Sequence, residues 1–159
     1  VAISCHEHLT PIWEKAIKDF QPYRSTSKAN INNTPLCLNL HIIISDKKSV
    51  LYFLDIFKKY RKQIDYFVLL PLINMGRAKD QEQPLNGREF LFNSLRNFNE
   101  ENISKVAFGA GFYLDLLANP WIPASIYEPE GFSKYIDLKY SPPKVYKSSF
   151  NLVETPQHE

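Results

Sequence analysis

The sequence YFVLLPLI at Tyr66–Ile73 decides the fold, because it is an almost unbroken apolar run with the length of a strand. Such a run predicts a strand buried on both faces, as in parallel sheets. Similar runs occupy residues 1–5 (VAISC) and 36–45 (LCLNLHIIIS), and a shorter one occupies 104–108 (SKVAF). Their starts lie about thirty to forty residues apart, which is typical of βαβ units. The sequence therefore predicts an α/β fold with a parallel sheet or barrel. An antiparallel α+β sheet is the weaker alternative, because the first three runs do not strictly alternate.

Helix signals lie between these runs. Thr10 suits an N-cap position and Pro11 the first helical position, and the apolar residues that follow recur at helical spacing. The polar stretch 21–35 is predicted to be a surface loop. Further helices are expected at about 48–63 and 87–99. Strands and helices should therefore alternate over the first two thirds of the chain.

The last part of the chain has a different character. Six of the eleven prolines fall in residues 119–159, and proline cannot donate to a helix or a sheet ladder. We expect an irregular extension there, with short strands near 125–127 and 135–138. The predicted organisation is a domain of βα units over 1–112, which the resemblance described below makes a partial α/β barrel, and a Pro-rich C-terminal extension over 113–159.

Composition excludes several classes of function. The 159 residues hold 19 basic and 17 acidic side chains, so no bulk field would retain nucleic acid or an anionic membrane. Two cysteines, Cys5 and Cys37, are too few for a disulfide scaffold and indicate reduced thiols of a cytoplasmic protein. Five glycines form no Gly-rich phosphate loop, and no segment resembles a signal peptide or a membrane span.

The stretch Cys5-His6-Glu7-His8 consists of residue types that bind metals. Adjacent residues point in different directions, however, and no second paired motif completes a tetrahedral site. We therefore predict no metal site here. Cys5 is expected to be a small buried apolar residue, with Glu7 and His8 in a loop or a helix cap.

Four residues are candidate ligand-binding groups at the carboxyl ends of the predicted strands. Ser4 and Ser45 each lie at or near the end of an apolar run, where a hydroxyl could bond a ligand. Asn74 follows the run at 66–73, and Arg77 follows the turn and could pair with a carboxylate or phosphate. The alternatives are that Ser45, followed by Asp46, simply caps the next helix, and that Arg77 is solvated in an ordinary loop.

The end of the third run resembles a known family. Leu70–Ile73 (LPLI), followed by residues 74–78 (NMGRA), resembles the late barrel strand of radical S-adenosylmethionine (SAM) enzymes, especially the SPASM-like or molybdenum-cofactor-like group. Residues 1–4 (VAIS) look like that family's fourth strand, whose Ser-bearing end faces SAM, and 38–45 (LNLHIIIS) looks like the fifth. The resemblance covers about residues 1–80. It implies late βα units of a TIM-like barrel that uses SAM and a [4Fe–4S] cluster, and it implies that the four candidate residues above hold SAM or substrate.

The sequence also departs from that family. The signature CxxxCxxC, whose cysteines bind the cluster, is missing, because Cys5 and Cys37 lie 32 residues apart. The glycine-rich SAM motif is missing too. The resemblance thus implies a partial barrel whose cluster-binding half lies ahead of Val1. It implies that residues 1–159 are inactive without that half, and that the complete enzyme acts on a small-molecule or peptide substrate. The alternative is a non-catalytic α/β domain that binds a small molecule or a protein through the same strand edge.

Overall fold

A computed structural model describes residues 1–25, 37–72 and 86–123, together with two short strands at 135–137 and 144–146. The chain forms two compact units, Val1–Tyr127 and Glu128–Glu159.

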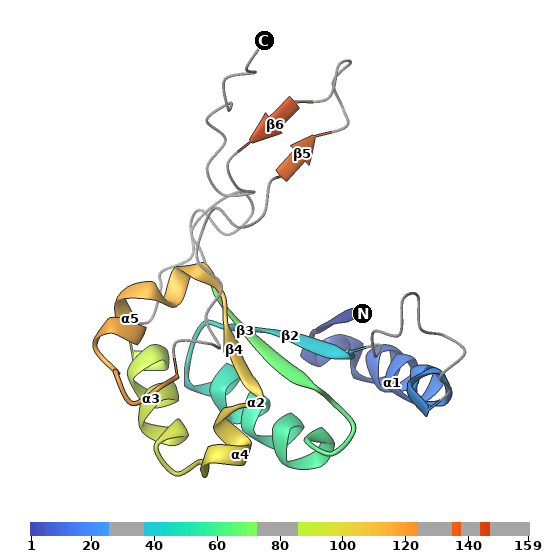
Figure 1. The fold of residues 1–159 in the computed structure, drawn as a ribbon, viewed down its shortest axis with the longest axis horizontal. Helices are drawn as coiled ribbons and strands as arrows, with labels where there is room; N and C mark the ends of the chain where they lie inside the picture. The colour runs from blue at the N-terminus through green and yellow to red at the C-terminus, as the bar shows by residue number, and fades with distance from the viewer. Residues whose placement is uncertain (26–36, 73–85, 124–134, 138–143, 147–159) are drawn as a thin grey trace. The chain divides into compact units, whose positions relative to one another are not determined.

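The first unit is built on a parallel sheet of four strands (Figure 1). Their order in the sheet is their order in the chain, and every neighbouring pair is parallel. The predicted α/β fold with a parallel sheet is therefore confirmed. The strands are β1 Ala2–Cys5, β2 Asn39–Ile44, β3 Tyr66–Pro71 and β4 Val106–Phe108.

Helices connect consecutive strands, as the sequence predicts. A single 3-10 turn, η1 (Glu7–Leu9), precedes α1, and α4 completes the connection from β3 to β4. After β4 the chain forms a second 3-10 turn, η5 (Ala110–Phe112). The α-helices are α1 Thr10–Ser25, α2 Lys47–Tyr60, α3 Asn86–Leu95, α4 Glu100–Ile103 and α5 Tyr113–Leu117.

The main difference from the predicted elements concerns α1, which continues to Ser25, although the polar composition predicts a loop from residue 21. Pro22 lies inside its last turns. A proline removes one backbone donor from a helix, but the helix continues through it, and the side-chain amide of Gln21 donates to the Gln63 carbonyl oxygen beyond the end of α2. The rest of the predicted loop, residues 26–35, lies outside the described residues.

The two faces of the sheet differ in burial. On β2, Leu40, Ile42 and Ile44 are buried, whereas Ile43 between them is 41% exposed. On β3, Phe67 is fully buried and Tyr66 is 43% exposed. This period of two means that one face packs on the core and the other stays partly open, rather than both faces being buried as the apolar runs predict.

The helices pack on the buried face. The Phe57 ring of α2 lies 4.8 Å from the Phe67 ring of β3, and the Phe92 ring of α3 stacks 5.7 Å from Phe108 of β4. Each such buried aromatic ring contributes about 1.5–3 kcal/mol to folding. In Figure 1, α2 and α3 lie on the same side of β2, β3 and β4. Right-handed crossovers between strands in sequential order place their helices on one face, so the other face, here called the open face, is not covered by them.

The second unit contains an antiparallel pair of strands, β5 (Tyr135–Asp137) and β6 (Lys144–Tyr146). Tyr135 pairs with Tyr146 and Asp137 with Lys144. A strand predicted at 135–138 is thus present, whereas β6 is an addition. The strand expected at 125–127 lies outside the described residues. The division at residue 112 and the half-barrel both stay predictions.

Candidate functional site

A cavity of about 360 Å³ lies at the carboxyl ends of β1 and β2. Ligands of parallel α/β folds bind at this edge, because every strand ends there in a loop that can carry functional side chains. One wall consists of Cys5, His6 and Glu7, at the end of β1 and the start of η1. The other consists of Ile43 and the residues from Ser45 to Tyr52 that face the cavity. We call it the β1–β2 cavity.

The turn from β2 to α2 is held by a capping box. Asp46 is the N-cap, and its carboxylate accepts from the Ser49 backbone N–H at 2.8 Å. The Ser49 hydroxyl accepts from the backbone N–H groups of Ser45 and Asp46 and donates to the Asp46 carbonyl oxygen. The bond from the Ser49 N–H lowers the pKa of Asp46, helped by the hydroxyls of Ser49 and Ser45. Asp46 is therefore an ionised group fixed at the cavity wall.

Ser45 itself is half-buried and lines the β1–β2 cavity. The alternative in which Ser45 caps the next helix is wrong in its detail, because Asp46 occupies the N-cap position. Since Asp46 contributes both the cap carboxylate and an extended backbone, Ser45 is left one residue outside the helix with its side chain at the cavity.

Gly87 in the first turn of α3 supports this turn. A Cβ at position 87 would lie 2.7 Å from the Asp46 Cα and 2.9 Å from its carbonyl carbon. These are backbone atoms, which cannot rotate away as a side chain can, so only glycine lets α3 approach this closely. The sequence offers a glycine at a helix start as a signal, but not the partner against which it packs.

Tyr52 was not among the candidate residues predicted from the sequence. It lies on α2 and lines the β1–β2 cavity. Its hydroxyl oxygen is buried, and in the part of the chain that the structure describes it has no hydrogen-bond partner. A buried hydroxyl without a partner costs about 1–3 kcal/mol, and such groups are rare in folded proteins. The Tyr52 side chain packs against the core, so this hydroxyl is a buried group beside the cavity and not part of its accessible wall.

The wall from β1 carries Cys5 and an ion pair. Burial raises the pKa of the Cys5 thiol to about 12, so it is a packing residue rather than a nucleophile. Glu7 pairs with Lys48 of α2 at 2.9 Å across the cavity, and both side chains are more than half exposed. The His6 and His8 rings lie 5.7 Å apart, but no three His, Cys, Asp or Glu side chains gather as a metal site within residues 1–25, 37–72 and 86–123.

The structure does not bring all predicted site residues together. Ser4 is exposed on β1, in register with His41 of β2, which pairs with Val68 of β3. Ser4 thus lies on the open face, whereas Ser45 lines the cavity. Asn74 and Arg77 lie outside the described residues. His41, which was not predicted from the sequence, lies beside Ser4 in the centre of the sheet.

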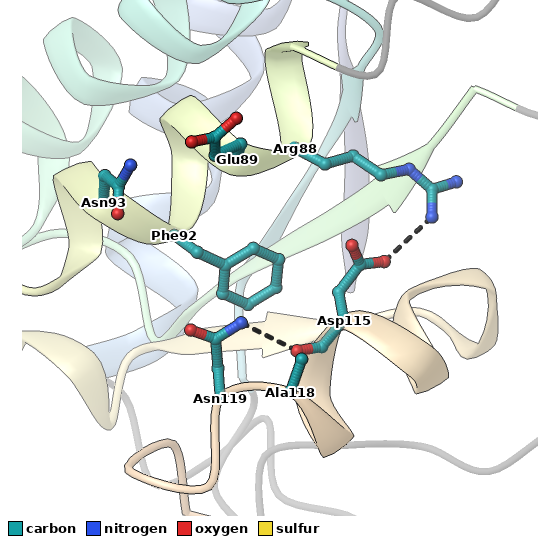
Figure 2. A pocket seen from close by; sticks show the side chains of 7 residues that line it. All are labelled: Arg88, Glu89, Phe92, Asn93, Asp115, Ala118 and Asn119. Carbon is teal, nitrogen blue, oxygen red and sulfur yellow. Dashed lines mark hydrogen bonds and ion pairs between the residues drawn. The ribbon is translucent and has the colours of Figure 1, made fainter.

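A second cavity, of about 280 Å³, lies between α3 and α5 (Figure 2). Arg88 of α3 and Asp115 of α5 point toward one another and form an ion pair at 2.8 Å. The Arg88 guanidinium also donates to the Gly111 carbonyl oxygen and lies 5.4 Å from the centre of the Phe112 ring. The Asn119 side chain donates to the Asp115 carbonyl oxygen. Because these groups bond to each other, they hold α5 against α3.

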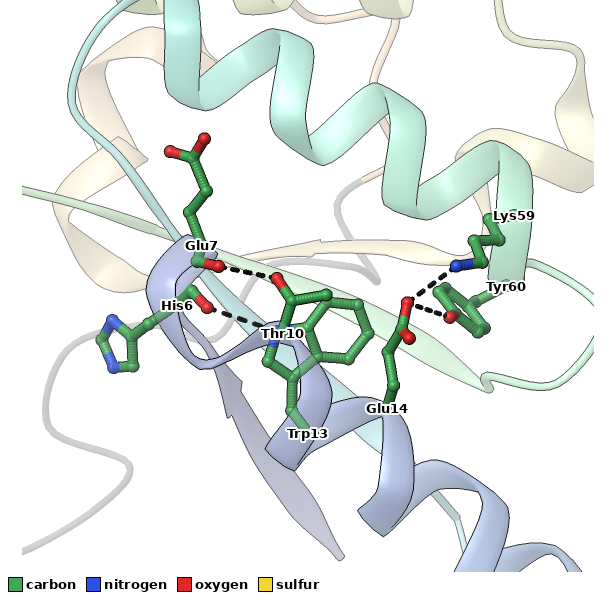
Figure 3. A network of polar contacts seen from close by, with 7 residues as sticks. All are labelled: His6, Glu7, Thr10, Trp13, Glu14, Lys59 and Tyr60. Atoms are coloured by element: carbon green, nitrogen blue, oxygen red, sulfur yellow. Dashed lines mark hydrogen bonds and ion pairs between the residues drawn. The ribbon is translucent and has the colours of Figure 1, made fainter.

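A polar network joins α1 to the end of α2 (Figure 3). The Glu14 carboxylate accepts from Lys59 Nζ at 2.7 Å and from the Tyr60 hydroxyl at 2.5 Å. Trp13 packs edge-on against the Tyr60 ring, and its indole N–H donates to the His6 carbonyl oxygen. The bonds from Lys59 and Tyr60 lower the pKa of Glu14, and burial, followed by the Glu14 bond, raises the pKa of Tyr60. We call this network the α1–α2 junction; its function is structural.

Two further findings bear on function. Among the described residues, no helix is both long and apolar enough to cross a membrane. No family model, no curated protein and no solved structure matches this chain.

Proposed function

We propose that this chain supplies the late βα units of a parallel barrel of the radical SAM type, with its carboxyl edge facing SAM or the substrate. The observation that carries this proposal is the sheet order β1-β2-β3-β4, with α2 and α3 packed on one face. Barrels keep their strands in chain order with helices outside. Doubly wound sheets reverse the order at a switch point and carry helices on both faces.

The open face supports the same proposal. In a closed barrel the inner face is filled by side chains from the other strands. Ile43 and Tyr66, on that face, are 41% and 43% exposed. In the described part of the chain, β1 and β4 are also the edges of the sheet. Unpaired edges and an uncovered face are what further parallel strands would complete.

The ligand-facing residues of the proposal are Ser4 and Ser45, together with Asn74 and Arg77 from outside the described residues. The cysteines do not fit a cluster. Cys5 and Cys37 are 32 residues apart in the chain, and Cys5 is buried with a pKa of about 12. The [4Fe–4S] cluster of the proposal therefore belongs to a CxxxCxxC segment outside residues 1–159, and no catalytic step is assigned to residues of this chain.

The experiment has two steps. The coding sequence ahead of Val1, and then the genes beside it, are read for CxxxCxxC. The polypeptides that carry this motif and residues 1–159 are then reconstituted anaerobically with iron and sulfide and assayed for 5′-deoxyadenosine from SAM. We expect cluster absorbance and SAM cleavage. The absence of the motif, or a reconstituted protein with neither cluster nor cleavage, would contradict the proposal.

A second candidate is a non-catalytic α/β domain that binds a small molecule. It is favoured by the β1–β2 cavity, which is formed without any residue from outside the chain. The two candidates differ in one readout. A binding domain takes up its ligand in the 159-residue chain alone and shows no SAM cleavage in any combination with a cluster-binding segment.

A further inference from the structure

We infer that α1 packs against the α1 helix of a second copy of this chain, in antiparallel orientation about a twofold axis. The docking surface consists of Ile12, Ala16 and Tyr23, here called the α1 stripe. The inference goes beyond the proposed function, because the dimer needs neither SAM nor an iron–sulfur cluster.

The first observation is the exposure of the α1 stripe. Ile12 and Tyr23 are 66% and 60% exposed, and Ala16 between them is half-buried. Ala16 and Tyr23 lie four and eleven residues after Ile12, so all three share one side of a helix with 3.6 residues per turn. Single exposed apolar residues are ordinary on a protein surface. An apolar stripe along one side of a helix instead indicates a surface that another element covers.

The second observation is the direction in which the α1 stripe faces. On the opposite side of α1, the Glu14 carboxylate accepts from Lys59 and Tyr60 at the end of α2. The Gln21 amide, on the same side as Glu14, donates to the Gln63 carbonyl oxygen. Helical spacing therefore turns the α1 stripe away from α2. In the described part of the chain, β1, which precedes α1, is an edge of the sheet, so a second copy can approach from this side.

The third observation is that two pairs of residues on α1 share nearly the same centre. Ile12 and Tyr23 have their midpoint between residues 17 and 18. Lys15 and Asp19, on one flank of the α1 stripe, have theirs at residue 17. A twofold axis near this point places Ile12 of each copy against Tyr23 of the other, and Lys15 beside Asp19. Apolar groups and opposite charges then meet, which is the self-complementarity that an interface between identical subunits requires.

The charges favour a second copy over a strongly charged partner. Lys15 and Asp19 form an ion pair within α1, and their side chains are 74% and 61% exposed. Such an exposed pair is weak, so each group can turn toward the other copy at little cost. The pair brings no net charge to the flank, so nucleic acid or a strongly basic protein would gain no attraction there.

The length of the α1 stripe sets the strength of the dimer. Residues 12–23 span about 16 Å of helix. Two helices that meet over this length bury less surface than a standard protein–protein interface. We therefore expect a weak, reversible dimer with a dissociation constant of about 10 µM to 1 mM.

The test is sedimentation equilibrium of the 159-residue chain over this range of concentrations. We expect a reversible monomer–dimer equilibrium. Ile12→Lys should weaken the dimer about tenfold or more, because it places an unpaired ammonium group at both symmetric contacts. Leu51→Lys is the matched control, since Leu51 is a 52% exposed apolar residue of another helix, and it should leave the dimer unchanged.

A charge reversal tests the antiparallel register. Lys15→Glu should weaken the dimer about threefold to tenfold, because two attractive pairs become repulsive. The double variant Lys15→Glu/Asp19→Lys should restore it. Circular dichroism of each variant confirms that α1 stays folded, so that a lost dimer is not a lost helix.

Four results would overturn the inference. They are a monomer at every concentration, equal weakening by Ile12→Lys and Leu51→Lys, a double variant as weak as Lys15→Glu, and a monomeric protein once residues encoded ahead of Val1 are included. The last result would assign the α1 stripe to those added residues. None of these measurements involves SAM cleavage, so failure of the dimer and failure of the proposed function are distinguishable.

Discussion

The β1–β2 cavity and the α1–α2 junction are both polar regions that contact α2, yet their polar groups are satisfied to different degrees. At the junction, Glu14, Lys59 and Tyr60 bond to one another, and the network joins two helices. At the cavity, the capping box is complete, but within the described residues the Tyr52 hydroxyl has no partner. A satisfied network contributes to the stability of the fold, whereas a buried hydroxyl without a partner lowers it.

The largest loss of stability should come from a change at Gly87, which packs against the Asp46 turn at the cavity wall. Gly87→Val places a branched side chain where even a Cβ would lie 2.7 Å from the Asp46 backbone. We expect a loss of about 3 kcal/mol or more in unfolding free energy, because the overlapping atoms belong to the backbone and cannot rotate away, and urea denaturation measures it. Amide shifts of Asp46 and Ser49 should change, while those of Glu14 and Tyr60 should not. Equal stability of Gly87→Val and the unmodified chain would show that α3 does not approach the turn as closely as described.

At the junction, Tyr60→Phe should cost about 1.5–3 kcal/mol, because it removes a hydrogen bond to a charged group from a largely buried side chain. Urea denaturation measures this loss. Glu14 keeps its bond from Lys59 in the variant. If Tyr60→Phe were as stable as the unmodified chain, the junction would not be the structural network described above.

The junction should also depend on acid. The pKa of Glu14 lies below its ordinary value of about 4.5 in the folded chain, first because Lys59 and then because Tyr60 bonds to it. The unfolded chain therefore binds the proton more readily, so this stabilisation is complete above about pH 4.5 and is lost as the pH falls through the folded pKa. Glu14→Gln should be less stable than the unmodified chain at neutral pH, and this difference should shrink below pH 4.5. The pKa of Asp46 is also lowered in the folded chain. Asp46 is present in both proteins, so its contribution to the pH dependence cancels from the difference between them. A difference that stays constant with pH would contradict this role of Glu14.

Much of the fold could be predicted from the sequence because its signals are local. The apolar runs at 1–5, 36–45 and 66–73 each contain a strand, and their spacing leaves room for one helix connection. The sequence places the end of α1 too early, because polar composition indicates a loop even where the Gln21 side chain bonds to the distant Gln63. Local composition does not contain that tertiary contact.

Less of the site could be predicted, because its features depend on contacts between distant residues. Ser45 was found from its position at a strand end, and it does line the cavity. Tyr52 resembles any aromatic residue of an amphipathic helix, and only its surroundings show that its hydroxyl lacks a partner. Gly87 is a glycine at a helix start in the sequence, and only the structure places it against Asp46.

The smallest expected effect is also the most direct test. The Tyr52 hydroxyl should form no hydrogen bond in the free protein, so Tyr52→Phe removes an unfavourable group without creating a void. Its unfolding free energy, measured in urea without ligand, should lie within about 0.5 kcal/mol of the unmodified chain or above it. A loss of about 1 kcal/mol or more would mean that the hydroxyl already has a partner in the folded chain, and it would contradict the contrast with Tyr60.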